Sequence, residues 1–366
     1  MHKQLNNVLT SVLAALVLLF NSALPCTAQT LSQAAARINL QVGTAVNPFF
    51  FSNPQYAQTL AREFNMIEPE NAMKWTATEP SPGKFNYTAG DEVVVFAAAH
   101  RMKVRGHNLL WGEHNPAWLD SGQFTAEQLH DMMKAHIIAV ASHYRGKVFA
   151  WDVVNEAMGN NGEVKHSIWY DRPGIGMAGK GTEYVAQAFR WAHQADPDAL
   201  LFYNDYDAEG LNAKSNGIYA MVMDFKKRGV PIDGVGLQMH VGLDNVPKDV
   251  AANIERLTAL GLQVQITEMD VRLPINSSGE LLNPTDLERQ AKIYGEIAGI
   301  CASHPGCTAF QTWGFTDRYT WIVHFTHGKF GQPLLFNAAY EPKPAYQAVL
   351  DALSKADPNI ARRRAE

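Results

Sequence analysis

Short apolar runs of β-strand type alternate with amphipathic helical patterns along the chain, and this alternation restricts its fold more than any other feature. Eight such runs fall between residues 35 and 353. They are Val42–Val46, Asn65–Glu68, Val104–Asn108, Val148–Val154, Leu200–Asn204, Gly234–Gln238, Val264–Thr267 and Ala309–Trp313. Strands that alternate with helices predict a parallel sheet.

The helical patterns between these runs have recognisable ends. Thr125 and Gln128 match the capping box, and the apolar helical spacing that follows them stops at Gly146. Another helix is expected over Ala213–Arg228, with Gly229 as its stop. Eight strand-helix units without an internal linker indicate a closed (β/α)8 TIM barrel of the α/β class. An open doubly wound sheet is the alternative, but the chain lacks a Gly-x-Gly-x-x-Gly turn.

The first 28 residues have the pattern of a secretory signal peptide. A lysine precedes the apolar run Val8–Phe20, and Ala28 offers a small residue for cleavage. A membrane anchor is the competing interpretation, but the run is shorter than the roughly 20 residues that a spanning helix needs. We expect one catalytic barrel domain over residues 29–353 and a short polar tail over residues 354–366, with Arg362–Arg364 solvated.

Composition restricts the partners and the bound groups. The net charge of −5 gives no indication of a nucleic-acid partner. After Ala28 the chain has two cysteines, Cys301 and Cys307, which are either a disulfide, permitted by export, or two buried thiols. No further pair of Cys or His residues has the spacing of metal ligands, so neither a metal nor a cofactor is expected.

Polar and aromatic residues follow most of the apolar runs, at the strand ends where a barrel carries its chemistry. They are Glu70, Asn71 and Lys74 after the second run, His107, Asn108 and Trp111 at the third, Asn155 and Glu156 at the fourth, Gln238 and His240 at the sixth, Glu268 and Asp270 at the seventh, and Trp313 and Trp321 at the eighth. Because all barrel strands end on the same face, these side chains are expected to line one site.

Two of these residues, Glu156 and Glu268, are glutamates that follow apolar runs. A carboxylate at the end of a buried strand is unfavourable for packing but well placed for chemistry. Alone, each would more often belong to a turn or a helix cap. Together they suggest an acid/base and a nucleophile, the pair that cleaves glycosidic bonds.

The segments around both glutamates resemble the two signatures of glycoside hydrolase family 10, the retaining endo-β-1,4-xylanases. The similar segments are Trp151–Ala157 and Ile266–Asp270, together with Gly106–Trp111, Tyr203–Tyr206, Gly229–Gln238, Trp313–Asp317 and Pro342–Tyr346. They occur in the family's order over essentially the whole chain after the expected signal peptide. The spacing of Cys301 and Cys307 also fits the family's disulfide.

The resemblance implies catalytic roles for five residues. Glu156 would be the general acid/base, and Glu268 the nucleophile that forms a covalent glycosyl-enzyme. Repulsion from Glu268, with partial burial adding to it, is expected to raise the pKa of Glu156. Asn155 would hydrogen-bond the sugar 2-hydroxyl. His240 would orient Glu268, and Asp270 would fix the tautomer of His240.

The resemblance also implies which residues bind the sugar chain. They are Glu70, Asn71, Lys74, His107, Trp111, Gln238, Trp313 and Trp321. Aromatic rings suit the apolar faces of pyranose sugars. Xylose lacks the hydroxymethyl group of glucose, and Trp313 and Trp321 would crowd the position of that group. The chain departs from the usual family pattern at His114, where a glutamine is frequent, and at Asp207 and Met239.

Two other functions remain open at this point. An endo-glucanase or mannanase on the same barrel would carry a similar pair of glutamates, although Glu70–Lys74 and Gln238–His240 favour a xylanase. A non-catalytic polysaccharide-binding protein would be favoured by the loss of one glutamate, and both are present. We therefore expect a secreted, monomeric enzyme that acts on xylan and xylo-oligosaccharides.

Overall fold

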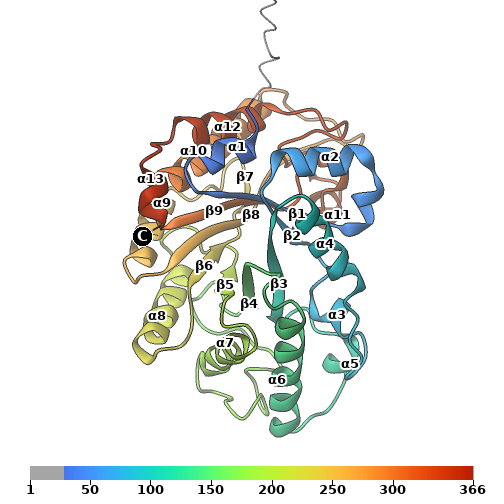
Figure 1. Ribbon diagram of the computed structural model, residues 1–366, viewed down its shortest axis with the longest axis vertical. Helices are drawn as coiled ribbons and strands as arrows, with labels where there is room; N and C mark the ends of the chain where they lie inside the picture. The colour runs from blue at the N-terminus through green and yellow to red at the C-terminus, as the bar shows by residue number, and fades with distance from the viewer. Residues whose placement is uncertain (1–28, 366) are drawn as a thin grey trace, which may run out of the picture.

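The computed structural model describes residues 29–365, so the expected signal peptide lies outside the described residues. Eight parallel strands form the barrel, and β9 pairs with both β1 and β8 to close it. The strands are β1 (Gln41–Val46), β2 (Met66–Pro69), β3 (Lys103–Trp111), β4 (Ala150–Asn155), β5 (Leu200–Asp205), β6 (Gly234–Leu237), β8 (Gln263–Pro274) and β9 (Cys307–Thr312). All eight predicted strands are confirmed. Figure 1 shows them at the centre of the molecule, with helices around them.

Two further short strands extend the sheet at the end of β8. The strand β7 (His240–Gly242) pairs with β8 in parallel, and β10 (Phe330–Gly331) pairs with it antiparallel. Neither was predicted, and β8 continues well beyond the expected end at Thr267. The extension places His240 directly opposite Asp270 in the β7–β8 register.

The helices surround the barrel and connect successive strands. They are α1 (Leu31–Ala36), α2 (Pro54–Glu63), α3 (Trp75–Thr78), α4 (Thr88–Ala99), α5 (Ala117–Asp120), α6 (Ala126–His143), α7 (Glu183–Ala195), α8 (Ala213–Arg228), α9 (Val250–Thr258), α10 (Asp286–Ser303), α11 (Ile322–Phe325), α12 (Pro344–Lys355) and α13 (Ile360–Ala365). The capping box of Thr125 and Gln128 is formed, and α8 has the predicted bounds with Gly229 in the left-handed conformation. Among residues 29–365, no helix is both long and apolar enough to cross a membrane.

The interior of the barrel is polar, whereas the space between strands and helices is apolar. Leu201, Phe189 and Phe225 belong to the apolar layer. Inside the barrel, Arg105 and Asp152 are fully buried and form an ion pair. This polar interior lies beneath the ends of the strands and supports the side chains that project from them.

The expectation that Arg362–Arg364 is a solvated tail is wrong for Arg364. Residues 360–365 form α13, and Ile360 is buried. The guanidinium of Arg364 donates hydrogen bonds to the backbone carbonyls of Ile38, Cys301, Ala302, His304 and Cys307. A charged side chain with five acceptors of this kind fastens the helix to the barrel.

The predicted disulfide between Cys301 and Cys307 is present, and it links the end of α10 to the start of β9. Replacing both cysteines by alanine is expected to lower the free energy of unfolding by about 2 kcal/mol, because the bond closes a small loop in the unfolded chain. Denaturant unfolding of both proteins would measure this loss. Activity should be kept, since the bond lies at the opposite end of β9 from the cleft described below. Equal unfolding midpoints would show that the bond adds no stability.

Candidate active site

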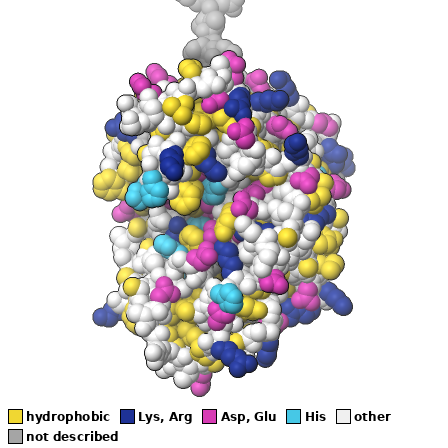
Figure 2. All heavy atoms as spheres, turned by 180° about the vertical axis from the view of Figure 1, so that it is seen from behind, with side chains coloured by type: hydrophobic (Ala, Val, Ile, Leu, Met, Phe, Trp, Pro, Cys, Tyr) yellow, Lys and Arg dark blue, Asp and Glu magenta, His cyan; other side chains and the backbone are white. Residues whose placement is uncertain are grey.

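A cleft of about 700 Å³ opens at the carboxyl ends of the barrel strands. All the catalytic and binding residues predicted from the sequence line this cleft, except Asp270, which lies behind His240. The lining combines carboxylates, a lysine, two histidines and three tryptophans. Figure 2 shows a hollow of similarly mixed composition near the middle of one face of the molecule.

Glu268 lies in β8, and its two carboxylate oxygens have separate partners. Its Oε1 accepts a hydrogen bond from Asn204 Nδ2 at 2.7 Å, and its Oε2 lies 3.2 Å from His240 Nε2. Asn204 is held in turn by Thr267 Oγ1, which donates to its Oδ1 at 2.8 Å. A Cβ atom at Gly236 would stand 2.2 Å from Asn204 Oδ1, so only glycine leaves room there. These contacts fix the carboxylate of Glu268 at the floor of the cleft.

His240 connects Glu268 to a buried aspartate. Its Nδ1 lies 2.8 Å from Asp270 Oδ2, an oxygen that also accepts a hydrogen bond from Trp321 Nε1 at 2.9 Å. Burial opposes a positive charge on His240, but Asp270 and Glu268 outweigh it and hold the pKa of His240 well above its usual value. The raised pKa favours the protonated form of His240, whose positive charge Asp270 and Glu268 balance. The expected role of Asp270 in fixing the tautomer of His240 stays a prediction.

Glu156 follows β4 with its backbone in the left-handed region, at φ 56°. That conformation is uncommon for a residue with a side chain, and such strain is concentrated at functional sites. The Glu156 N–H donates to the carbonyl of Asn204 at 2.9 Å. Its Oε1 accepts hydrogen bonds from Gln238 Nε2 at 3.0 Å and Asn155 Nδ2 at 3.1 Å. The side chain is thereby turned into the cleft.

Burial raises the pKa of Glu156 to about 7, and the negative charge of Glu268 adds to this effect. The direction agrees with the expectation from the sequence, but the order of the causes is reversed, because burial is the larger one. The hydrogen bond from Gln238 acts in the opposite direction. Glu156 can therefore both donate and accept a proton near neutral pH.

Lys74 supplies a positive charge to the cleft. Its Nζ donates to Asn71 Oδ1 at 2.8 Å and lies 5.1 Å from the ring centre of Trp111. Burial lowers the pKa of Lys74, and the nearby carboxylates of Glu268 and Glu70 counteract this. Burial also raises the pKa of Glu70. This group offers both donors and acceptors to hydroxyl groups.

Aromatic side chains form the walls. Trp313 is buried, with His107 packed edge-on at 5.2 Å between ring centres. His114 packs on Trp111 at 5.1 Å between ring centres, so this departure from the usual pattern lies behind a wall of the cleft. Phe325, 63% exposed, lies 4.6 Å from the ring of Trp321 and extends that wall outward.

Sequence reasoning missed several residues of the site. They are Asn204, Tyr206, Asp207, Asn245, Arg272 and Phe325 at the cleft, and Glu68, Arg105 and Asp152 beneath it. Asn204 could have been found, because it ends the fifth apolar run as the other site residues end theirs. Glu68 ends the second run in the same way, but no local pattern tells that it points inward together with Arg105 and Asp152.

Comparison with known proteins agrees with this geometry. Residues 30–352 match the model of glycosyl hydrolase family 10. The chain is 39% identical to the endo-1,4-β-xylanase B of Thermotoga neapolitana, over 88% of this chain and 90% of that protein. The crystal structure of xylanase 10B from Thermotoga petrophila RKU-1 in complex with xylobiose is 41% identical and superposes with a TM-score of 0.83, covering 89% and 98% of the two chains.

One longer relative has a different name. The chain is 36% identical to the exoglucanase XynX of Acetivibrio thermocellus, and it spans only 29% of that protein's length. The family match nevertheless covers almost all of the described chain, and the relatives that it spans nearly completely have the same barrel. The protein therefore belongs to glycosyl hydrolase family 10.

Proposed function

We propose that the protein is a secreted, monomeric endo-1,4-β-xylanase that hydrolyses internal bonds of xylan with retention of anomeric configuration. The observation that carries the proposal is the pair Glu156 and Glu268 in one cleft, each in a different environment. Glu156 is buried, and its pKa is raised to about 7. Glu268 accepts hydrogen bonds at both oxygens. Such a division suits an acid and a nucleophile.

In the first step, Glu268 attacks the anomeric carbon while Glu156 gives its proton to the departing glycosidic oxygen. The Asn204 and His240 hydrogen bonds hold the attacking carboxylate in place, so little reorganisation is needed. Asn155 donates a hydrogen bond to Glu156 and accepts one from Asn204, the residue that also holds Glu268, and from there it would bind the sugar 2-hydroxyl. That contact strengthens as positive charge develops on the sugar.

In the second step, Glu156 removes a proton from water, which then attacks the glycosyl-enzyme. Esterification of Glu268 removes its negative charge, so the repulsion that raised the pKa of Glu156 is relieved. Glu156 then becomes the anion that this step requires. Burial persists, so the fall in pKa is partial, and Glu156 remains basic enough to accept the proton.

The tryptophan walls support xylan as the substrate. Trp313 and Trp321 both contact His240 edge-on, at 6.4 and 5.1 Å between ring centres, and His240 contacts Glu268. Two large rings this close to the proposed nucleophile would leave little space for the hydroxymethyl group that glucose carries and xylose lacks.

The pH dependence of activity should follow the protonation of Glu156. The active form carries the proton, so kcat/KM on xylo-oligosaccharides should fall about tenfold per pH unit above its pKa of about 7. In Glu268→Gln, a carbon-13 NMR titration of Glu156 should give a lower pKa that remains above 4.5, because burial is the larger cause. A return to 4.5 would make repulsion the main cause.

Release of reducing ends from β-1,4-xylan and from carboxymethyl-cellulose tests the substrate, and NMR of the first product tests the stereochemistry. Rapid cleavage of xylan with β-product first is expected. Preference for cellulose would support the activity named for the exoglucanase relative. Initial α-product would contradict the assigned mechanism. Secretion predicts a mature chain that begins at Gln29, which mass spectrometry of exported protein would reveal.

A further inference from the structure

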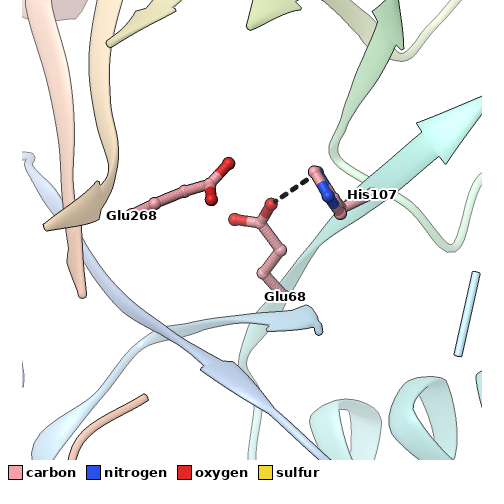
Figure 3. A group of neighbouring side chains, drawn as sticks. All are labelled: Glu68, His107 and Glu268. Carbon is pink, nitrogen blue, oxygen red and sulfur yellow. Dashed lines mark ion pairs between the residues drawn. The ribbon is translucent and has the colours of Figure 1, made fainter. Parts of the chain in front are cut away.

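A third glutamate lies beneath the two that line the cleft. Glu68 projects from β2 into the barrel and has no exposed surface. Figure 3 shows its carboxyl group between Glu268 and His107. Its Oε1 lies 3.4 Å from His107 Nδ1, and one ligand atom from each of the three residues falls within a mutual distance of 4.8 Å.

No positively charged side chain among the neighbours of Glu68 is paired with Glu68 alone. Arg105, from β3, lies 3.7 Å away, but its guanidinium is bonded through two nitrogens to Asp152 of β4. His107 Nδ1 lies nearer to Asp152, at 3.0 Å. The remaining charges that face the group are Glu268, from β8, and Lys74, whose Nζ is directed at Asn71 and the tryptophans. A negative charge on Glu68 would therefore be buried with only a cation that it shares with Asp152 to offset it.

A neutral carboxyl group fits this position. Gln311 Nε2 donates to Glu68 Oε2 at 2.9 Å, and within the described chain Oε1 has no hydrogen-bond donor. A Cβ atom at Gly43 would stand 2.5 Å from Gln311 Oε1, so that glycine makes room for the amide. A proton on Glu68 would have the Asp152 carboxylate as its acceptor, because both carboxyl groups lie against His107 Nδ1, at 3.4 and 3.0 Å. Two adjacent carboxyl groups can share one proton in this way.

We propose that Glu68 is a positioning residue that acts as a neutral acid: it shares one proton with Asp152, the residue that holds His107 at the cleft, and it keeps a third negative charge away from Glu268. Burial, with repulsion from Asp152 adding to it, raises the pKa of Glu68 well above its usual value, in agreement with this geometry. The inference rests on the proposed function, because it takes Glu268 as the nucleophile.

A bound cation is a poorer occupant of the same cluster. Both oxygens of Glu268 already accept hydrogen bonds, from Asn204 and His240. His107 Nδ1 faces Asp152, and the Arg105 guanidinium next to Glu68 would repel a metal ion. The side chains of Glu68, His107 and Glu268 are therefore better suited to share a proton than to bind a metal ion.

Infrared difference spectroscopy between the wild type and Glu68→Gln tests the protonation state directly. At pH 9, above the values near 7 of Glu156 and Glu209, the wild type should retain a carbonyl band of a protonated acid that Glu68→Gln lacks. The matched control is Glu63→Gln, at a buried glutamate on α2 that accepts from Leu31 N–H and Tyr346 Oη. This control should keep the band. If the wild type and Glu68→Gln have the same spectrum in the region of protonated carboxyl groups, Glu68 is ionised and the proposal is wrong.

Kinetics on xylo-oligosaccharides test the positioning role. Glu68→Gln, a neutral isostere, should keep kcat within about threefold and leave the alkaline limb of kcat/KM in place. Glu68→Ala, which releases His107 and Asp152, should lower kcat by about tenfold or more. Equal losses in both variants would contradict a neutral role. If Glu68→Ala does not fold, the kinetics and the infrared spectrum of Glu68→Gln still decide whether Glu68 is neutral. A wild type inactive on xylan would refute the proposed function, while the infrared result would still report on Glu68.

Discussion

The variant Glu268→Ala is expected to lose turnover on xylan by roughly 10⁵-fold while keeping its fold, the loss expected when a nucleophile is removed. The carboxylate would form the bond to the sugar, and no other group in the cleft lies in its position. The donor groups of Asn204 and His240 would then point into the space that the carboxylate has left. Circular dichroism and a denaturant midpoint close to those of the wild type would show that the loss concerns chemistry.

Azide provides a sharper test of the same variant. The small anion can occupy the space of the missing carboxylate and attack an aryl xylobioside, giving the α-glycosyl azide. The matched control Glu288→Ala changes an exposed glutamate on α10 and should leave kcat unaltered. Substantial residual activity of Glu268→Ala on xylan, or the β-azide as its product, would contradict the nucleophile assignment.

The variant Glu156→Ala should show losses that depend on the leaving group. Xylan, whose leaving group needs a proton, should be cleaved roughly 10³-fold more slowly. An aryl xylobioside with an acidic phenol needs no proton, so its first step should remain fast. The second step lacks its base, and a burst of phenol should be followed by slow turnover. Stopped-flow absorbance would resolve the two phases.

Glu156→Ala also distinguishes an acid/base role of Glu156 from a purely structural role. Mass spectrometry of the quenched reaction should reveal the sugar attached to Glu268. Azide should restore turnover and give the β-glycosyl azide, because it attacks the glycosyl-enzyme from the face that Glu156 served. Equal losses on xylan and on the aryl substrate would argue against the acid assignment.

Much of this fold could be predicted because its determinants are local. Each barrel strand is a short apolar run, and some of the helices have a capping box or a glycine stop, as at Thr125 and Gly229. The residues at the cleft were found for a related reason. Parallel strands end on one face, so their terminal polar residues meet. This rule placed Glu156 and Glu268 in one cleft without knowledge of any distance.

Other features depend on contacts between distant segments, and local patterns do not encode them. Glu68 ends an apolar run as Glu156 does, yet it points into the barrel, and its environment is set by Arg105 and Asp152 from other strands. The pKa of Glu156 was expected to depend mainly on repulsion. Burial proved the larger cause because side chains from several strands enclose the carboxyl group. The extension of β8 depends on its partners β7 and β10.

The anchoring of α13 has a practical consequence for attaching the protein to a surface. Arg364 binds carbonyl groups of the segments that lead into β1 and β9, at the end of the barrel away from the cleft. A linker attached to α13 would therefore leave from the rear of the catalyst. Beads coupled through such a linker should present the open cleft to long, insoluble polysaccharide, whereas random coupling through lysines would turn part of the molecules toward the support.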